Sequence, residues 1–238
     1  MLANEPSCLE CPVTNCFIQR NCSKEWLLIV NEGKKVFKRR SGQAIIYVGM
    51  PLTALYFIHH GKVKVVSDGL FGKQQIKRLA KTGDILGFRE LEGTHISPSS
   101  VYSIEDSVIC SIEREFFIDV LKANPNMMLE TLYLLTKELR KSEWRMKNLM
   151  LMNAREKISY SLIYIQDVFG TNENGELDVK LTRQEIGDIA CTSREEVSRT
   201  LSDFEKEGII KMEGKKIFLQ NLQDLKNMIG INEDVSFI

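Results

Sequence analysis

The chain has 238 residues, of which 43% are hydrophobic and 27% are charged, and its formal net charge at pH 7 is zero. This length suits two domains, each able to bury a core of its own. A neutral chain lacks the overall basic field that draws a protein onto nucleic acid, so any such site must be a local patch. No apolar run approaches the roughly 18 residues of a membrane-spanning helix, and no N-terminal secretory signal is evident. We therefore expect a cytoplasmic protein with no membrane partner.

Four of the six cysteines lie within residues 7–22, in the stretch SCLECPVTNCFIQRNC. Thiols stay reduced in the cytosol, so a cluster of this kind indicates metal binding or redox chemistry more often than disulfides. A fifth cysteine, Cys110, lies far away in the apolar segment DSVICSI, and Cys191 is the sixth.

Residues 26–120 are predicted to form many short strands. Val, Ile, Tyr and Phe enrich the segments AIIYV from Ala44 and ALYFIHHGKVKVV from Ala54, as is typical of strands. Glycine-containing turns, such as those at Gly61 and Gly83, separate these segments. Regular short strands with glycine-rich turns favour a small barrel or jelly roll.

One long helix is predicted from Pro125 to about residue 152, because proline is well tolerated in the first turn of a helix. Its apolar positions alternate in steps of four and three residues, which is the heptad pattern of a helix that pairs with another helix. Packing against its own barrel is the alternative. A polar residue in such a seam, here Ser142, tunes association. The predicted dimer seam comprises Met128, Leu132, Leu135, Leu139, Ser142, Met146 and Leu149.

A second helix is predicted from about Asn153 to Val168, and the most informative stretch, LTRQEIGDIACTSREEVSRTLSDFEKEGII, comes after it. Thr182 with Glu185, and Ser193 with Glu196, have the spacing of capping boxes at the starts of two short helices. Two short helices joined by a tight turn form a helix-turn-helix, whose second helix fits the DNA major groove.

The second of these helices keeps polar side chains on its outer face near its N-terminal end. Arginine can donate two hydrogen bonds to guanine, glutamate can accept one from cytosine, and serine can do either. A solvated polar face is the alternative. A hairpin with a basic tip follows, in EGIIKMEGKKIFLQN. We expect base contacts from Arg194, Glu195, Ser198 and Arg199, and phosphate contacts from Arg183, Lys215 and Lys216.

With GDILGF at Gly83–Phe88, the long helix and SREEVSR at Ser193–Arg199, the sequence resembles the Crp–Fnr family of bacterial transcription regulators. The resemblance implies an α+β protein. No nucleophile–base pair or glycine-rich phosphate loop suggests catalysis, so we do not expect an enzyme. The resemblance also implies a homodimer that binds a near-palindromic site on double-stranded DNA and contacts RNA polymerase. The family often has glycine where this chain has Cys191, so mild backbone strain is expected there. The implied domains are a cysteine-rich segment (1–25), a cyclic-nucleotide-binding-like β-roll (26–124), a dimerisation helix (125–152) and a winged helix-turn-helix (153–238).

The resemblance also bears on the ligand of the β-roll. The cyclic-nucleotide branch cradles phosphate with a Gly-Glu-Leu turn and an Arg-Ser pair. Here Glu90-Leu91 lacks the preceding glycine and no Arg-Ser pair follows, so cAMP is not expected. The oxygen-sensing branch holds a [4Fe–4S] cluster with three N-terminal cysteines and one distant cysteine. The matching positions are Cys8, Cys11, Cys16 and Cys110, with one residue fewer before the third cysteine and with Cys22 as a substitute ligand.

Other readings of the cysteines stay open. The four N-terminal thiols, Cys22 included, have a compact span that a structural zinc could use. The thiols could also sense oxidants directly, or the regulator could be gated by an unidentified small molecule. Haem has no supporting signature, because His59 and His60 are expected at an exposed strand end and His95 is the remaining histidine. The favoured function is a transcription regulator that responds to redox state, oxygen or nitric oxide through an iron–sulfur cluster.

Overall fold

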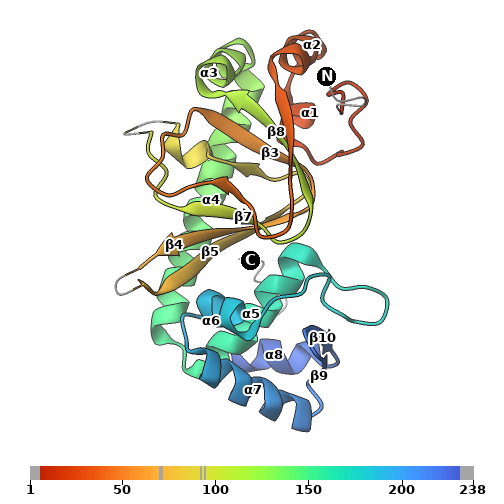
Figure 1. The fold of residues 1–238 in the computed structure, drawn as a ribbon, viewed down its shortest axis with the longest axis vertical. Helices are drawn as coiled ribbons and strands as arrows, with labels where there is room; N and C mark the ends of the chain where they lie inside the picture. Colours follow the sequence, from red (N-terminus) through yellow and green to blue (C-terminus); the bar gives the residue numbers. More distant parts are fainter. Residues whose placement is uncertain (1–5, 70–71, 92, 94, 231–238) are drawn as a thin grey trace. The chain divides into compact units, whose positions relative to one another are not determined.

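A computed structural model describes residues 6–69, 72–91, 93 and 95–230 (Figure 1). The chain divides into two compact units. The first contains the residues up to Asp68 and Lys77–Lys137, and the second contains Gly69–Ile76 and the residues from Glu138 onward. The division falls inside one long helix, α4 (Pro125–Leu151), which matches the long helix predicted from the sequence.

Two four-stranded sheets form the β-roll within the described residues, and this confirms the predicted α+β fold. The strand orders are β1-β8-β3-β6 and β2-β7-β4-β5. Side chains from both sheets, among them Ile58, Val63 and Ile109, share one buried cluster, so the core lies between the sheets. The strands are β1 (Lys35–Arg39), β2 (Ala44–Ile46), β3 (Ala54–His60), β4 (Lys62–Asp68), β5 (Gln74–Lys81), β6 (Ile85–Leu86), β7 (Ser100–Ser103) and β8 (Ser107–Glu113).

The turn between β3 and β4 shows why glycine separates these strands. Gly61 has a φ of +111°, and a Cβ there would meet the Ser107 Oγ at 2.3 Å. Any larger residue would therefore push β8 away from the turn and strain the backbone at the same time.

The expectation that strands begin at residue 26 is wrong. Two helices come first, α1 (Phe17–Asn21) and α2 (Lys24–Gly33). Ser23 caps α2 by accepting a hydrogen bond from the Trp26 backbone N–H at 3.4 Å. The apolar run in this segment suits a strand by composition, but Leu27 and Val30 are buried three residues apart, which is helical spacing.

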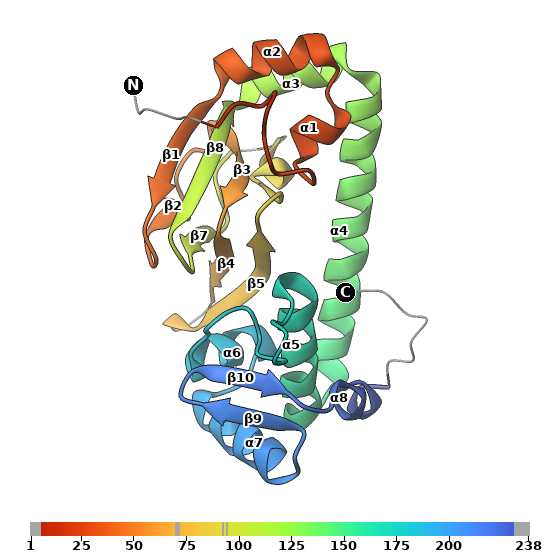
Figure 2. The ribbon, with the colours of Figure 1, turned by 90° about the vertical axis from the view of Figure 1, so that its right-hand side faces the viewer.

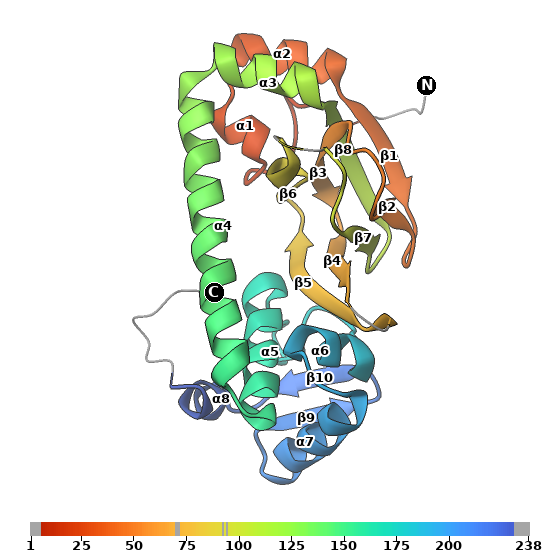
Figure 3. The same cartoon turned by 90° about the vertical axis from the view of Figure 1, so that its left-hand side faces the viewer.

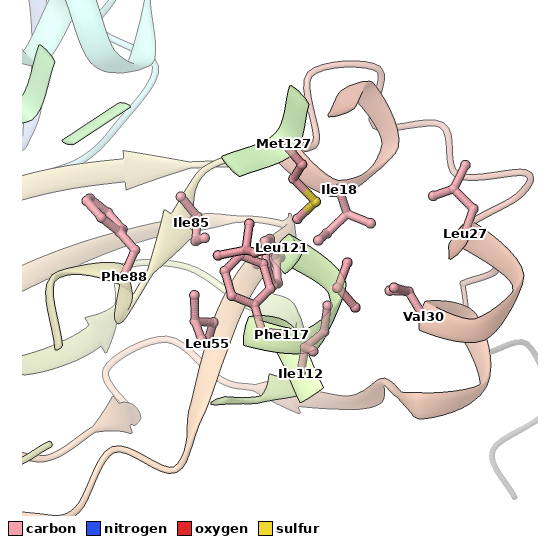
Figure 4. Packing of buried hydrophobic residues seen from close by; sticks show 12 residues of the cluster. Ile18, Leu27, Val30, Leu55, Ile85, Phe88, Ile112, Phe117, Leu121 and Met127 are labelled. Atoms are coloured by element: carbon pink, nitrogen blue, oxygen red, sulfur yellow. The ribbon is translucent and has the colours of Figure 1, made fainter. Parts of the chain in front are cut away.

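A second hydrophobic cluster joins these N-terminal helices to the sheet and to the start of α4 (Figure 4). It includes Ile18 of α1, Met127 of α4 and Phe117 of α3 (Arg114–Ala123). Figure 2 shows α1 lying beside the beginning of α4. The helix between Cys16 and Cys22 is thus packed against the end of α4 that belongs to the first unit.

The second unit contains a helix-turn-helix followed by a hairpin, as predicted (Figure 3). The hairpin strands pair antiparallel. A short helix that was not predicted, α8, follows them. No helix among the described residues has both the length and the apolar character that a membrane span requires. The elements after α4 are α5 (Ala154–Phe169), α6 (Arg183–Ala190), α7 (Arg194–Lys206), β9 (Ile210–Glu213), β10 (Lys216–Leu219) and α8 (Leu222–Met228).

Candidate functional site

The helix α6 begins with a complete capping box. The Thr182 Oγ1 accepts from the Glu185 N–H at 3.1 Å, and the Glu185 carboxylate accepts from the Thr182 N–H at 2.7 Å. At the start of α7 only half of the expected box forms. Ser193 accepts from the Glu196 N–H at 3.1 Å, but the Glu196 carboxylate pairs with the Arg199 guanidinium at 2.6 Å instead. Both helix starts are nevertheless fixed by a side-chain cap.

The turn between α6 and α7 is tight. Cys191 has φ 53° and ψ 45°, the left-handed conformation that favours glycine, and this confirms the expected strain. Gly187 is required for another reason, since a Cβ there would meet the Thr192 carbonyl oxygen at 2.9 Å. The two residues together set the close approach of the helices.

The outer face of α7 is open to a partner. Val197, Leu201 and Phe204 are fully buried on the inner face. The Arg199 side chain is 71% exposed, and its ion pair with Glu196 lies along the helix surface. The four residues predicted to contact bases, Arg194, Glu195, Ser198 and Arg199, are all exposed.

The three predicted phosphate-contacting cations are placed differently from one another. Lys215 is exposed at the tip of the β9–β10 hairpin, beside Gly214 with its φ of +63°. Lys216 pairs with Glu176 at 3.2 Å, and the half-buried Arg183 lies 3.0 Å from the Met212 sulfur. Lys215 is therefore the best placed of the three to reach a phosphate.

The predicted dimer seam coincides with an exposed apolar stripe along α4. Leu139 is 59% exposed, a large fraction for a leucine. Leu149 departs from the seam, since it is 8% exposed while the neighbouring Met150 is 78% exposed. A straight helix drifts by about 20° per heptad, which moves the stripe from one position to the next. The exposed seam members are Met128, Leu132, Leu135, Leu139, Ser142 and Met146.

Four cysteine side chains from two distant parts of the sequence line one cavity. Cys8, Cys11 and Cys16 come from the N-terminal loop, and Cys110 comes from strand β8. The cavity has a volume of about 30 Å³. The fifth candidate ligand, Cys22, is not among the residues that line it. Its sulfur lies 4.0 Å from the Asn124 Oδ1, at the junction of α3 and α4.

Two polar side chains that the sequence did not indicate lie beside these thiols. The Lys34 ammonium is 3.4 Å from the Cys8 sulfur, and the His59 Nδ1 is 3.6 Å from the Cys11 sulfur. The Asn31 side chain links the two residues, because its Oδ1 accepts from the Cys8 N–H at 2.8 Å and from the Lys34 Nζ at 2.6 Å. The expectation that His59 is exposed is wrong, since folding turns its half-buried ring toward the cavity.

Burial makes these thiols weaker acids. It raises the pKa of Cys110 to about 12 and the pKa of Cys22 to about 11. The pKa of Cys16 is also raised by burial, although hydrogen bonds from the backbone at Gln19 and Ile18 oppose the shift. Metal binding to such thiols must release protons, because the ligand is the thiolate.

The donor set fits an iron–sulfur cluster, but the space available is small. Among the described residues lining the cavity there are four thiols and one ammonium and no carboxylate. A volume of about 30 Å³ is space for two or three waters at roughly 10–15 Å³ each, so a four-iron cluster requires the loop to move outward. In agreement, the described residues contain no group of three or more His, Cys, Asp or Glu side chains placed closely enough to hold a metal ion.

A second cavity, of about 80 Å³, lies inside the β-roll. Arg78, Arg89 and Glu90 line it together with the buried serines Ser97 and Ser99. Arg78 is already engaged, donating to the Ile85 carbonyl at 2.9 Å. The lining is polar enough to accept a small ligand.

Comparison with known proteins gives a match for each of the two domains. The Crp-like helix-turn-helix domain matches residues 156–228, and the cyclic nucleotide-binding domain matches residues 36–124. The chain is 27% identical over 206 residues to the anaerobic regulatory protein of Aggregatibacter actinomycetemcomitans, covering 85% of this chain and 79% of that protein. It is 25% identical over 249 residues to the fumarate and nitrate reduction regulatory protein of Vibrio cholerae, covering 98% and 99%.

The solved structures show the same fold. FixK2 from Bradyrhizobium japonicum superimposes with a TM-score of 0.73 at 24% identity, covering 82% of this chain and 96% of that one. A putative transcriptional regulator of the crp/fnr family from Eubacterium rectale gives a TM-score of 0.72 at 16% identity, covering 90% and 98%.

Proposed function

Because the chain belongs to the Crp–Fnr family of bacterial transcription regulators, in its Fnr-like branch, we propose that a cluster in the cysteine cavity makes it a sensor of redox state, oxygen or nitric oxide. The chain is a DNA-binding regulator and not an enzyme. The proposal covers the chemistry of sensing and the cysteines that ligate the cluster. It also includes contact of the dimer with RNA polymerase.

The observation that carries the proposal is the meeting of four sulfurs from two separate parts of the chain. Cys8, Cys11 and Cys16 lie on a loop, and Cys110 lies on a strand of the roll. An iron–sulfur cluster takes four thiolates and, when bound, supplies a centre that oxidants can destroy. A cluster with three ligands on the loop and one on the sheet would add a covalent tie between the loop and the roll, and loss of the cluster would remove that tie.

The cysteine loop has a direct route to the dimer helix. Cys16 precedes α1, whose Ile18 packs in the same buried cluster as Met127 of α4. The Asn124 side chain accepts from the Ser23 N–H at 3.0 Å and donates to the Val120 carbonyl at 2.7 Å. A displacement of the loop therefore reaches the start of α4 through both apolar packing and hydrogen bonds.

A change at the start of α4 would affect the DNA-binding dimer. The exposed stripe on α4 offers an apolar face to a second copy of the chain, and dimerisation would bury it. Two α7 helices would then enter major grooves about 34 Å apart on a near-palindromic site. To act as a switch, the two states of the cavity must differ in their preference for that dimer.

A second candidate function is a regulator gated by a small molecule, with the cysteines holding zinc or acting as thiol sensors. The cavity of about 80 Å³ lined by Arg78, Arg89 and Ser99 favours this candidate. The absence of an Arg-Ser pair at this place argues against cAMP as the ligand.

Metal analysis of protein purified without air separates the two candidates. The proposal predicts brown protein with about four irons per chain that bleaches in air. Colourless protein with stoichiometric zinc would overturn the cluster and leave the DNA-binding function intact.

A further inference from the structure

Lys34 is a cation buried next to the proposed ligands. The residue is only 9% exposed, and its backbone N–H donates to the Val30 carbonyl at 3.0 Å, where α2 ends. Its ammonium lies between the Cys8 sulfur at 3.4 Å and the Asn31 Oδ1 at 2.6 Å. The helix end and the amide thus hold this charge at the wall of the cavity.

Among the residues that the structure describes, no carboxylate pairs with the Lys34 ammonium. None of the described residues that line the cavity is an aspartate or a glutamate, and the Asn31 amide is neutral. A buried charge is costly unless an opposite charge balances it. Among the described residues, the groups placed to balance it are the cavity thiolates, and an anionic occupant of the cavity would do the same.

We propose that Lys34 is the countercharge of the iron–sulfur cluster, a positioning residue that donates to the Cys8 thiolate and sets the cluster's reduction potential without ligating iron. This inference rests on the proposed function. A cluster core with four thiolates carries net negative charge, and hydrogen bonds to its sulfurs tune its potential. A fixed positive charge in a poorly hydrated site stabilises the more negative, reduced state.

The field of Lys34 also reaches the ligand on the sheet. Lys34 and Cys110 line the same cavity, together with the thiols of the N-terminal loop. The ammonium therefore acts on thiols from both parts of the chain that form the site.

The next residue provides a matched control. The Lys35 side chain is 74% exposed and pairs with Glu113 at 2.8 Å on the surface. Replacing either lysine with methionine removes the same charge while keeping an unbranched side chain. Solvent screens the field of Lys35, so its loss should leave the cluster unaffected.

The experiment compares the wild-type chain with Lys34→Met, Lys34→Arg and Lys35→Met after anaerobic reconstitution with iron and sulfide. The experiment measures two quantities, the iron content per chain and the midpoint potential of the cluster. The potential is followed by electron paramagnetic resonance while dithionite donates one electron per cluster. We expect Lys34→Met to shift the potential to more negative values and to lower iron content. Lys34→Arg and Lys35→Met should stay near the wild-type potential.

The outcomes separate this inference from the proposed function. If the wild-type chain takes up no iron, both are overturned. If it takes up iron and Lys34→Met keeps the wild-type potential, only the role of Lys34 is overturned. Should Lys34→Met hold too little cluster to titrate, Lys34→Gln, which keeps a donor without the charge, replaces it, and a wild-type potential in that variant contradicts the inference.

Discussion

The helix-turn-helix and the cysteine loop present their reactive side chains in opposite ways. On α7, Arg194 and Arg199 are exposed on a helix whose start is capped and whose inner face is fully buried. In the N-terminal loop, Cys8 and Cys11 are half-buried on a segment with no helix or strand of its own. The side chains of the first arrangement are already exposed to a partner, while the loop of the second must move to admit a four-iron cluster.

We therefore treat α7 as a fixed DNA-contacting surface and the cysteine loop as the part that changes position. A reading surface gains specificity from fixed side chains, because each base contact depends on geometry. A switch needs an element with two states whose equilibrium the ligand shifts. Changes to the loop should therefore alter response to the signal, and changes to α7 should alter only the DNA sequence that is chosen.

The largest effect is expected from Cys110→Ala. The thiol of Cys110 is the one candidate ligand from the sheet, so its loss should reduce iron from about four per chain to near zero in anaerobic protein. Cys22→Ala is the control, since Cys22 is not among the residues lining the cavity, and iron analysis of both variants is the measurement. Loss of metal in Cys22→Ala with retention in Cys110→Ala would indicate a site made by the four N-terminal thiols.

Next in size is Arg199→Ala on the reading face. Losing a bidentate contact to a base should cost about 1–3 kcal/mol of discrimination between a selected duplex and a random one. Competition binding measures this ratio. Lys206→Ala, in the last turn of the same helix, is the control because Lys206 lies far from the N-terminal end that enters the groove. Unchanged selectivity in Arg199→Ala would show that another face reads the DNA.

A charge in the stripe of α4 should weaken dimerisation. Leu139→Glu places two carboxylates in the seam of the dimer, and we expect a dissociation constant raised by about tenfold or more. Thr136→Glu adds the same charge at an exposed position three residues away, outside the predicted seam. Sedimentation equilibrium should show weaker association for the first variant alone. Equal association of the two variants would place the dimer contact elsewhere.

Asn124→Ala should uncouple the loop from α4 with a smaller effect. The substitution leaves the Ser23 N–H without its acceptor, at a cost of about 1–3 kcal/mol, while the thiols stay in place. Iron content should match the wild type, and the change in DNA affinity on exposure to air should shrink several-fold. The control is Asn126→Ala, at an exposed position in the first turn of α4. A full wild-type response in Asn124→Ala would exclude this route.

The smallest effect is expected at the strained turn. Cys191→Gly relieves a left-handed backbone at a non-glycine residue, which should stabilise the fold by about 1 kcal/mol. For a chain of this size that corresponds to a rise in Tm of about 2–4 °C, measurable by calorimetry. Cys191→Ala keeps the strain and should show no rise. A lower Tm for the glycine variant would mean that the turn is not under strain.

The sequence predicted the helix-turn-helix well because its signals are local. Thr182 and Glu185 lie three residues apart, and the helical spacing of Val197 and Leu201 marks the buried face. The helix α2 was missed because its apolar run has strand-like composition, although Ser23 caps its start and Leu27 and Val30 are buried at helical spacing.

The polar wall of the cysteine cavity could not be predicted for a different reason. Lys34 is 26 positions from Cys8, and His59 is 48 positions from Cys11. No short motif joins residues at such separations, and only the pairing of strands and the packing of the N-terminal helices brings them together. The cysteines themselves stood out because their spacing is short and thiols are rare.

The most direct test of the account is the DNA affinity of one anaerobic sample, measured before and after air bleaches its visible absorption. Fluorescence anisotropy with a duplex selected by the protein itself gives both values. The account predicts at least about tenfold weaker binding to this duplex after bleaching, with binding to a random duplex unchanged. Equal affinity for the selected duplex in both states would contradict the claim that the cysteine cavity governs DNA binding.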